Sequence, residues 1–187
     1  MTPTFRTSQP GSAADPSLPH LILVGLPGCG KTTVGQAVAD KLGRTFLDMD
    51  LEIERREGRS ISQIFGEKGE GYFRKKELEL TEELKLVGNM IVSPGGGWVT
   101  SAGAISLVRP PSKLVYLKVK PATALKRLGP MRMMRPLLSR PHPEVELERL
   151  MKERKASYES ADHVVDTELY GLQRVIDDVA RLASALR

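Results

Sequence analysis

The chain has 187 residues, of which 40% are hydrophobic and 27% charged, which is the size and composition of one globular domain with a core of its own. Its single cysteine excludes an intramolecular disulfide, three scattered histidines offer no zinc site, and no apolar run approaches the ~20 residues of a membrane-spanning helix. The net charge of +5 suits an acidic partner, but charges of both signs are interleaved and aromatic residues are only 5%, so we expect neither nucleic-acid nor membrane binding.

Residues 1–19 are rich in Pro, Ser, Thr and Ala and lack a periodic apolar pattern, which predicts a disordered N-terminal tail. The tail has no apolar stretch of a secretory signal, and the lone cysteine fits a reducing compartment, so we expect a cytoplasmic protein. Residues 20–187 contain no internal repeat and no change of composition, and we expect a single domain there.

From His20 onwards, short apolar runs alternate with amphipathic stretches. The apolar runs predict five strands, at about residues 20–24, 44–50, 89–94, 112–120 and 163–167. The stretches between and after them predict helices, at about residues 32–43, 50–58, 60–69, 70–88, 100–108, 121–129, 144–161 and 171–187. Gly43 is a natural C-cap for the first helix, and Thr100 is the expected N-cap of the helix over 100–108. The alternation predicts an α/β fold around a mostly parallel sheet.

The stretch "GLPGCGKT", Gly25 to Thr32, fits the phosphate-binding pattern G-x-x-x-x-G-K-[ST], with an apolar strand before it and an amphipathic helix after it. Glycines let backbone N–H groups converge on phosphate oxygens, and the helix N-terminus adds partial positive charge. Lys31 is expected to reach the β- and γ-phosphates and the Thr32 hydroxyl to bind Mg²⁺. The alternative is a glycine-rich turn that binds no ligand.

The stretch "LDMD" carries Asp48 and Asp50 at the end of the second predicted strand. In an extended chain, side chains at i and i+2 point to the same side, and ligands of parallel sheets bind at the carboxyl ends of the strands. Two acids there suit Mg²⁺ binding and proton transfer from a substrate hydroxyl. The alternative is that Asp50 caps a helix beginning at Leu51.

In the long helix predicted after Gly71, Glu77 falls on the same stripe as Phe73 and Leu80. A lone carboxylate facing the core is costly, and Arg74 lies within reach one turn earlier. We expect Glu77 to be partly buried and to hold Arg74, an arrangement suited to gripping a carboxylate. An ordinary surface ion pair is the alternative.

Between Pro130 and Pro143 the chain has no apolar periodicity and carries Arg132, Arg135 and Arg140. A segment of this length is usually a lid or disordered, and a lid arginine suits the charge of a transferring phosphoryl group. A solvated surface arginine is the alternative for each of the three.

Three consecutive glycines, Gly95 to Gly97, follow the third predicted strand in "PGGGW". Such a run weakens a fold unless the chain needs its freedom. By itself it reads as a bare turn, whereas beside Asp50 and Arg74 it reads as a wall without side chains, against which a small ring can lie.

Taken together in this order, "GLPGCGKT", "LDMD", "FRKKE", "GGG", "RPLL" and "RKASY" make the chain resemble the shikimate kinase family from about His20 onwards. The resemblance implies a three-layer P-loop kinase fold with a five-stranded parallel sheet, flanking helices and a mobile lid at about 130–143. It implies transfer of the γ-phosphoryl group of ATP to the 3-hydroxyl of shikimate, in the route to chorismate and the aromatic amino acids. ATP, shikimate and Mg²⁺ are then the partners of what we expect to be a monomer.

For the nucleotide, the resemblance implies that Lys31 and Arg135 act on the phosphates, with Arg135 swinging over them in the lid. It implies that Arg127 packs on the adenine and that Asp48 acts near Mg²⁺ through water, beside Thr32. The other positions implied to contact the phosphates are Gly28, Cys29, Gly30 and Thr33.

For the substrate, the resemblance implies that Asp50 binds the shikimate hydroxyls and is the base for the attacking one. Arg74 and Arg154 are implied to clamp the carboxylate, with Glu77 orienting Arg74. The ring hydroxyls are expected to meet the backbone of Gly95, Gly96 and Gly97.

The stretch "VVDTELYGL" departs from the family pattern, because residues 169–172 offer no proline where the family often has one in an adenine-contacting loop. We therefore assign no adenine contact there. The nearest rival function is a related small-molecule kinase such as gluconate kinase. A non-catalytic sensing module is the rival of another class, and it would be expected to lose Lys31, Asp50 or the lid arginine.

Overall fold

Five parallel strands form one sheet in the order β2-β3-β1-β4-β5, in a computed structural model that describes residues 17–135, 137–139 and 141–186. Their bounds are β1 Leu21–Val24, β2 Phe46–Asp48, β3 Ile91–Ser93, β4 Lys113–Lys118 and β5 His163–Asp166. The parallel five-stranded sheet predicted from the sequence is confirmed. Most of the predicted tail, residues 1–16, lies outside the described residues, as does Arg140 of the predicted lid.

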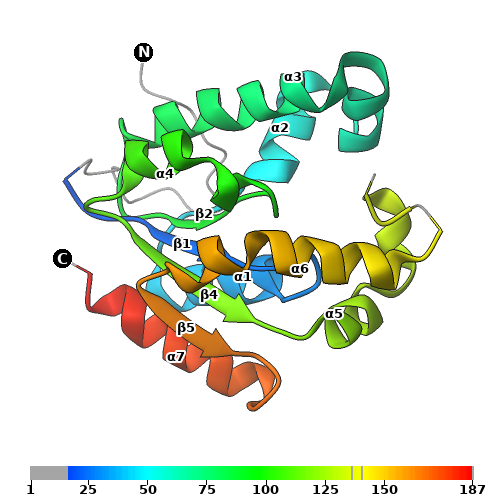
Figure 1. Cartoon of the computed structure of the whole chain (residues 1–187). Coiled ribbons are helices and arrows are strands. Elements are labelled where there is room, and N and C mark those ends of the chain that lie inside the picture. Colours follow the sequence, from blue (N-terminus) through cyan, green and yellow to red (C-terminus); the bar gives the residue numbers. More distant parts are fainter. Residues whose placement is uncertain (1–16, 136, 140, 187) are drawn as a thin grey trace.

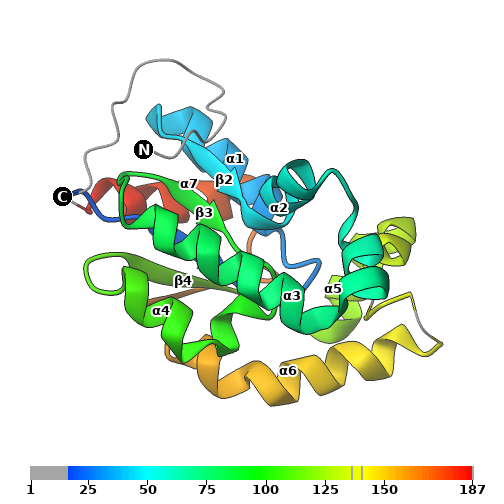
Figure 2. The ribbon, with the colours of Figure 1, turned by 90° about the horizontal axis from the view of Figure 1, so that it is seen from above.

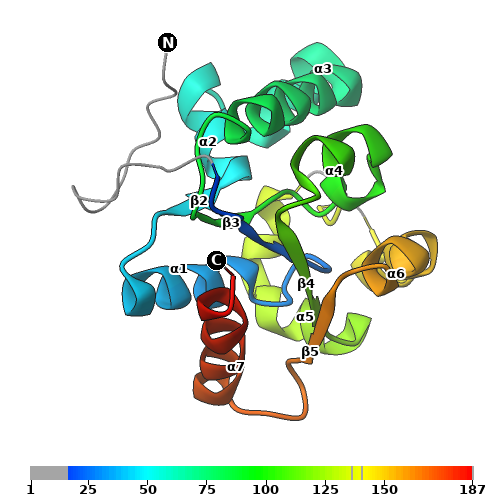
Figure 3. The ribbon, with the colours of Figure 1, turned by 90° about the vertical axis from the view of Figure 1, so that its left-hand side faces the viewer.

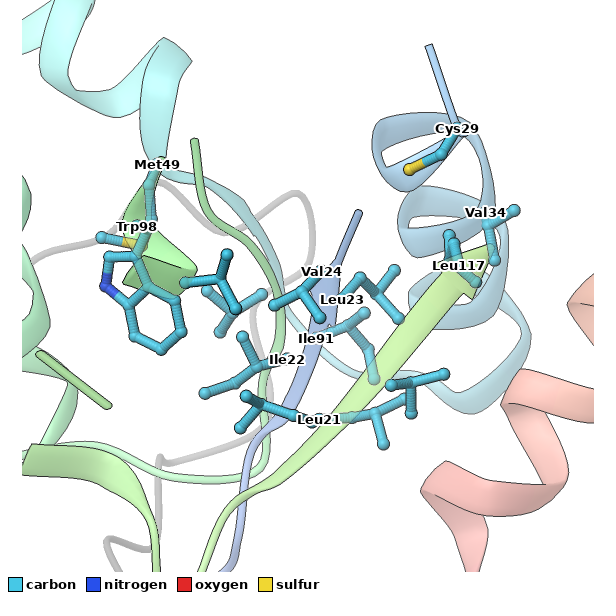
Figure 4. Close-up of a cluster of buried hydrophobic side chains, with 14 of the residues drawn as sticks. Leu21, Ile22, Leu23, Val24, Cys29, Val34, Met49, Ile91, Trp98 and Leu117 are labelled. Carbon is cyan, nitrogen blue, oxygen red and sulfur yellow. The ribbon is translucent and has the colours of Figure 1, made fainter. Parts of the chain in front are cut away.

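The central strand β1 is buried along its whole length, with its register set by β3 and β4 on its two sides. Leu21 pairs with both Ile91 and Lys113, and each residue of β1 is at most 2% exposed. A parallel strand that is covered on both faces needs an unbroken apolar sequence, which explains why "LILV" does not alternate. Figure 4 shows these side chains at the middle of the core.

Helices cover both faces of the sheet (Figures 1 and 2). Figure 3 shows α1 and α7 together on one face and α3, α4 and α6 on the other, which makes the three-layer arrangement expected from the sequence. The helices are α1 Lys31–Leu42, α2 Met49–Glu57, α3 Ile61–Leu84, α4 Ala102–Val108, α5 Pro121–Leu128, α6 Pro143–Glu159 and α7 Leu172–Ser184. Two short 3₁₀ helices are η1 Trp98–Thr100 and η2 Gly129–Met134.

The ends of two helices test the predicted caps. Gly43 follows α1 in the left-handed region (φ 63°) and its N–H donates to the Ala39 carbonyl, as expected for a C-cap glycine. The predicted N-cap of α4 is wrong by one residue. Ser101 caps that helix by accepting from the Ala104 N–H, because Thr100 belongs to η1, where its hydroxyl donates to the Gly97 carbonyl.

The helices predicted over 60–69 and 70–88 form one element, α3, which is kinked at Gly69. Gly69 has φ 79° and ψ 168°, a conformation that a glycine adopts at little cost, so the helical hydrogen bonding is interrupted there. Ser60 and Gln63 form a capping box at the start of α3. The kink sends the second half of α3 back along the sheet with Arg74 and Glu77 on it.

The functional segments predicted from the sequence leave the sheet at one edge, the carboxyl ends of the strands. The phosphate loop follows β1, Asp48 ends β2, and the glycine run follows β3. The chain visits β2 and β3 on one side of β1 before it crosses to β4, so this edge holds the crevice at which ligands of such sheets bind. In the described part of the chain, no helix has both the length and the apolar character to cross a bilayer.

Candidate active site

The phosphate loop connects β1 to α1 and depends on glycines at strained positions. Gly25, Gly28 and Gly30 have φ angles of 149°, 85° and 101°. A Cβ on Gly28 would lie 2.4 Å from the carbonyl oxygen of Ala124 in α5, so the loop packs against α5 only because this residue has no side chain. The fold therefore supports the predicted phosphate-binding conformation.

Lys31 turns its side chain back into this loop. Its ammonium group donates to the carbonyl of Gly25 at 3.0 Å and to that of Leu26 at 3.3 Å. Of the other predicted phosphate contacts, Cys29 is buried, with its sulfur 3.9 Å from the same ammonium, and Thr33 is exposed. The positive charge of Lys31 thus lies inside the loop where phosphate oxygens would bind.

Thr32 and Asp48 meet at the mouth of the loop. The Thr32 hydroxyl donates to Asp48 Oδ2 at 2.7 Å, so the hydroxyl predicted to bind Mg²⁺ and the carboxylate predicted to act on it through water are neighbours. Asp48 Oδ1 also accepts from the Leu51 N–H and caps α2. The predicted alternative for Asp50 is therefore wrong: the helix begins at Met49, and its cap is Asp48.

Asp50 lies in the first turn of α2, so it does not share an extended strand with Asp48 as the sequence predicted. Its Oδ1 is buried and has no hydrogen-bond partner among the described residues. Burial raises the pKa of this carboxyl above its ordinary value, and the nearby Asp48 charge raises it further. Arg135 opposes the shift, with its Nη1 3.9 Å from Asp50 Oδ2.

Glu77 is 2% exposed, and its Oε2 accepts from Arg74 Nη1 at 2.5 Å. Burial raises the pKa of Glu77 to about 7, against the opposing charge of Arg74. Arg74 also donates to Glu70, so two carboxylates hold its guanidinium. The predicted pair is present and Glu77 is buried, while Glu77 Oε1 has no partner within the described part of the chain. We call Asp50 Oδ1 and Glu77 Oε1 the inner oxygens.

The glycine run faces charged side chains at each of its three positions. A Cβ on Gly95 would lie 2.6 Å from each of the inner oxygens. A Cβ on Gly96 would lie 3.0 Å from Arg154 Nη1, and one on Gly97 only 2.3 Å from Arg74 Nη2. A side chain at Gly95 or Gly97 would have to displace these groups, and one at Gly96 would press on Arg154, so the run is a wall without side chains.

Two residues of α6 reach the glycine run from the other side. Arg154 is 7% exposed, and its Nη1 donates to the Gly96 carbonyl at 2.6 Å. The Tyr158 hydroxyl approaches the same carbonyl at 3.4 Å. The sequence singled out Arg154 and assigned Tyr158 no role, and only the fold brings both to Gly96.

A pocket opens between these groups. Among its lining residues are Asp50, Arg74, Arg154, the glycine run and Arg135, which come from separate parts of the sequence. The rest of its wall is apolar, and the sequence assigned none of these residues to a site, because apolar residues read as core or packing positions. The apolar residues are Pro27, Ile61, Phe65, Phe73, Leu137, Leu138 and Leu150.

Arg135 borders this pocket from the segment after η2. The backbone there is ordered by bonds from the Leu138 and Ser139 N–H groups to the Arg135 carbonyl, and Leu138 is buried. The segment predicted to be an irregular lid loop thus contains η2 and a turn. Arg135 lines the pocket, and its guanidinium lies beside Asp50. A lid arginine would be needed at this place.

Arg127 lies at the end of α5, away from the pocket. Its guanidinium donates to both the hydroxyl and the carbonyl oxygen of Thr167, at 2.8 Å each. Glu168 accepts from the Lys120 N–H in turn, so the stretch after β5 is fastened to α5. The contact of Arg127 with adenine stays a prediction.

Comparison with known proteins agrees with this geometry. The family model described as "Shikimate kinase" matches residues 27–183. A shikimate kinase of Moorella thermoacetica is 38% identical over 149 residues, which cover 80% of this chain and 85% of that protein.

Solved structures give the same result. A structure of shikimate kinase from Acinetobacter baumannii in complex with shikimate superposes with a TM-score of 0.83, at 35% identity over 90% of this chain and 94% of that one. A gluconokinase from Sinorhizobium meliloti, at 16% identity and a TM-score of 0.56, shares only the fold, over 89% of this chain and 94% of its own. The chain belongs to the shikimate kinase family, whose members are ATP-dependent kinases.

Proposed function

We propose that the protein transfers the γ-phosphoryl group of ATP to the 3-hydroxyl of shikimate, giving shikimate 3-phosphate and ADP. One observation carries the proposal. A single pocket joins two arginines suited to a carboxylate, Arg74 and Arg154, to Asp50, whose buried Oδ1 is a free acceptor among the described residues. A small acid that carries hydroxyl groups matches that set of donors and acceptors.

The acceptor fits the pocket by its two ends. The carboxylate of shikimate binds Arg74 and Arg154, and the bond from Glu77 fixes the direction of the Arg74 guanidinium. The hydroxyl groups lie along the glycine run, where the inner oxygens accept their hydrogen bonds. Two buried acceptors without partners in the described structure are costly, and bound hydroxyl groups remove that cost.

Asp50 is the base in this proposal. The 3-hydroxyl donates its hydrogen bond to the Asp50 carboxylate, its oxygen attacks the γ-phosphorus, and the proton passes to Asp50 as the bond to ADP breaks. The raised pKa makes Asp50 a better proton acceptor than an exposed aspartate. Because the transition state of phosphoryl transfer is loose, positioning and charge stabilisation supply most of the rate enhancement.

ATP binds with its phosphates in the loop at residues 25–32, where Lys31 and the N–H groups of Gly28, Cys29, Gly30, Thr32 and Thr33 receive them. Mg²⁺ fits beside them, because Thr32 offers a hydroxyl ligand and Asp48, 2.7 Å away, can hold a water of the ion, and this ion commonly uses few protein ligands together with phosphates and water. When bound, Mg²⁺ neutralises charge on the β- and γ-phosphates.

The segment at about 130–143 acts as a lid that closes when both substrates are bound. Arg135 leaves Asp50 and moves onto the transferring phosphoryl group, where its charge is needed. Closure excludes water and so suppresses hydrolysis of ATP. Arg127 packs on the adenine, at the other end of the nucleotide.

A panel of acceptors tests the proposal. ADP release is followed with MgATP and shikimate, gluconate or no acceptor, at equal concentrations. Release that needs shikimate supports the assignment, whereas equal or faster release with gluconate contradicts it. We further propose that residues 20–187 act as one domain and that the enzyme is a cytoplasmic monomer. Size-exclusion chromatography tests the oligomeric state.

A further inference from the structure

Trp98 directly follows the glycine run and is the only tryptophan of the sequence. Its backbone N–H donates to the Gly95 carbonyl at 3.1 Å, which closes the turn that the glycines make. The side chain is 1% exposed, and Figure 4 shows its indole nitrogen turned away from the aliphatic side chains of β1. A buried indole N–H needs an acceptor, and its acceptor is in α3.

The acceptor is Thr81, which is fully buried one turn after Glu77. The indole Nε1–H of Trp98 donates to Thr81 Oγ1 at 2.9 Å, and the Thr81 hydroxyl donates to the main-chain carbonyl of Glu77 at 2.7 Å. A threonine hydroxyl has one proton, so its bond to Glu77 leaves a lone pair directed at the indole. Every polar group in this chain of hydrogen bonds has a partner.

Glu77 meets the glycine run and its neighbour Trp98 at two points. Its carbonyl is joined to Trp98 through Thr81 by hydrogen bonds, and its carboxylate packs against Gly95. The hydrogen bonds and this packing contact together hold the run in place along α3. Arg74, whose guanidinium lies against Gly97, is held in the same register. A shift of about 1 Å in such a register is enough to impair a binding site.

We propose that Trp98 and Thr81 form a positioning link that holds the glycine run in register with Arg74 and Glu77 and so sets the affinity for the acceptor. The inference rests on the proposed function, since the acceptor is shikimate. Neither residue lines the pocket itself, so the link acts through Glu77 and the glycine run. A purely structural role would alter thermal stability and leave acceptor binding unchanged.

The experiment compares two substitutions at Thr81. Thr81→Val removes the hydroxyl and leaves the indole N–H without an acceptor, whereas Thr81→Ser keeps both hydrogen bonds. We expect Thr81→Val to raise the KM for shikimate about tenfold, because the loss of one hydrogen bond typically weakens binding by about that factor. The KM for ATP should stay within about twofold of the wild-type value. Thr81→Ser should restore the KM for shikimate to nearly that of the wild type.

Val179→Ala is the control for stability, because Val179 is fully buried in α7 on the opposite face of the sheet. It should lower Tm without changing either KM. An unchanged KM for shikimate in Thr81→Val, with Tm lowered as in Val179→Ala, would overturn the positioning role. A wild type that releases no shikimate-dependent ADP would overturn the proposed function, and this inference with it.

A second experiment tests the link in a way that does not depend on how much stability Thr81→Val loses. Trp98→Phe removes the N–H donor, and the double variant Trp98→Phe/Thr81→Val should bind shikimate no worse than Trp98→Phe alone, since both changes break one link. Additive losses would contradict a shared link. In the wild type, shikimate should change the Trp98 fluorescence and ATP alone should not. A Trp98 fluorescence that does not change at a saturating concentration of shikimate would also count against the proposal.

Discussion

Asp50 and Glu77, which are 27 positions apart in sequence, bring their inner oxygens to the same side of Gly95. Each of these oxygens lies 2.6 Å from the point where a Cβ on Gly95 would stand. The first residue of the glycine run is therefore the place where the proposed base and the residue that orients the carboxylate clamp come together. A side chain at this position has to displace both.

We therefore expect Gly95→Ala to disable the acceptor site. The added methyl group pushes on both inner oxygens, so the KM for shikimate should rise at least about tenfold and kcat should fall, while ATP binding is kept. Initial rates measured against each substrate give the two constants.

Gly103→Ala is the matched control, because a Cβ there meets nothing within 4 Å and alanine suits its helix better than glycine. If Gly95→Ala lowered Tm and left the KM for shikimate unchanged, the glycine run would be a simple turn. Gly96→Ala is expected to give a milder defect, because its methyl group has one tight contact, with Arg154 at 3.0 Å, and an ordinary contact with Pro27.

Several of these features could be predicted from the sequence because they depend on neighbours in the chain. The apolar run of β1 and the positions of the glycines in the loop identify the phosphate site. The spacing of Arg74 and Glu77 along one helix identifies them as a pair. The single-turn separation of these two residues fixes their contact whatever the rest of the fold does.

Other features could not be predicted because they depend on packing between distant segments. The residues around Asp48 could either extend the strand or begin the helix. Because Asp48 caps α2, the strand ends there and Asp50 lies in the helix. The apolar wall of the pocket, the Arg127–Thr167 contact and the Trp98–Thr81 bond join residues that no periodicity relates. The family resemblance supplied roles for Arg154 and Gly96 but not the bond between them.

Replacing Arg74 tests the carboxylate clamp. Arg74→Ala removes the guanidinium and leaves Glu77 without its ion-pair partner, so the KM for shikimate should rise roughly a hundredfold, with the KM for ATP nearly unchanged. Lys75→Ala, which alters the exposed neighbouring residue, is the control for lost charge on the same helix. Equal KM values for shikimate in the two variants would show that Arg74 does not bind the acceptor.

The burial of Glu77 predicts how stability depends on pH. Its folded-state pKa, about 7, lies above the ordinary value of 4.5, so the protonated form stabilises the substrate-free protein. That contribution is complete below about pH 4.5 and is lost as the pH rises through about 7. The free energy of unfolding of the wild type, relative to Glu77→Gln, should fall by up to about 3 kcal/mol from pH 5 to pH 8.

Urea unfolding at four pH values measures this difference. Glu79→Gln removes an exposed carboxylate from the same helix and is the control. A difference that grows with rising pH would mean that the ion pair with Arg74 outweighs the cost of burying the Glu77 carboxylate, which is the reverse of the expected balance.

Asp50→Asn tests the proposed base. The amide keeps the shape of the side chain but cannot take the proton, so kcat should fall about 10²- to 10⁴-fold. The affinity for ATP should stay within about twofold, because Asp50 lies outside the phosphate loop. Single-turnover rates and nucleotide binding check the two expectations. Asp40→Asn, on the exposed side of α1, controls for a nonspecific loss of charge. Turnover near that of the wild type would exclude Asp50 from the chemistry.

The central claim is that the pocket between the glycine run, Arg74 and Arg154 holds shikimate with its 3-hydroxyl at Asp50. Analysis of the product by phosphorus and proton NMR, after reaction of the purified protein with MgATP and shikimate, tests it most directly. We predict one product, phosphorylated at the 3-hydroxyl, in an amount equal to the ADP released. Phosphate on another hydroxyl, or ADP released with inorganic phosphate and intact shikimate, would contradict it.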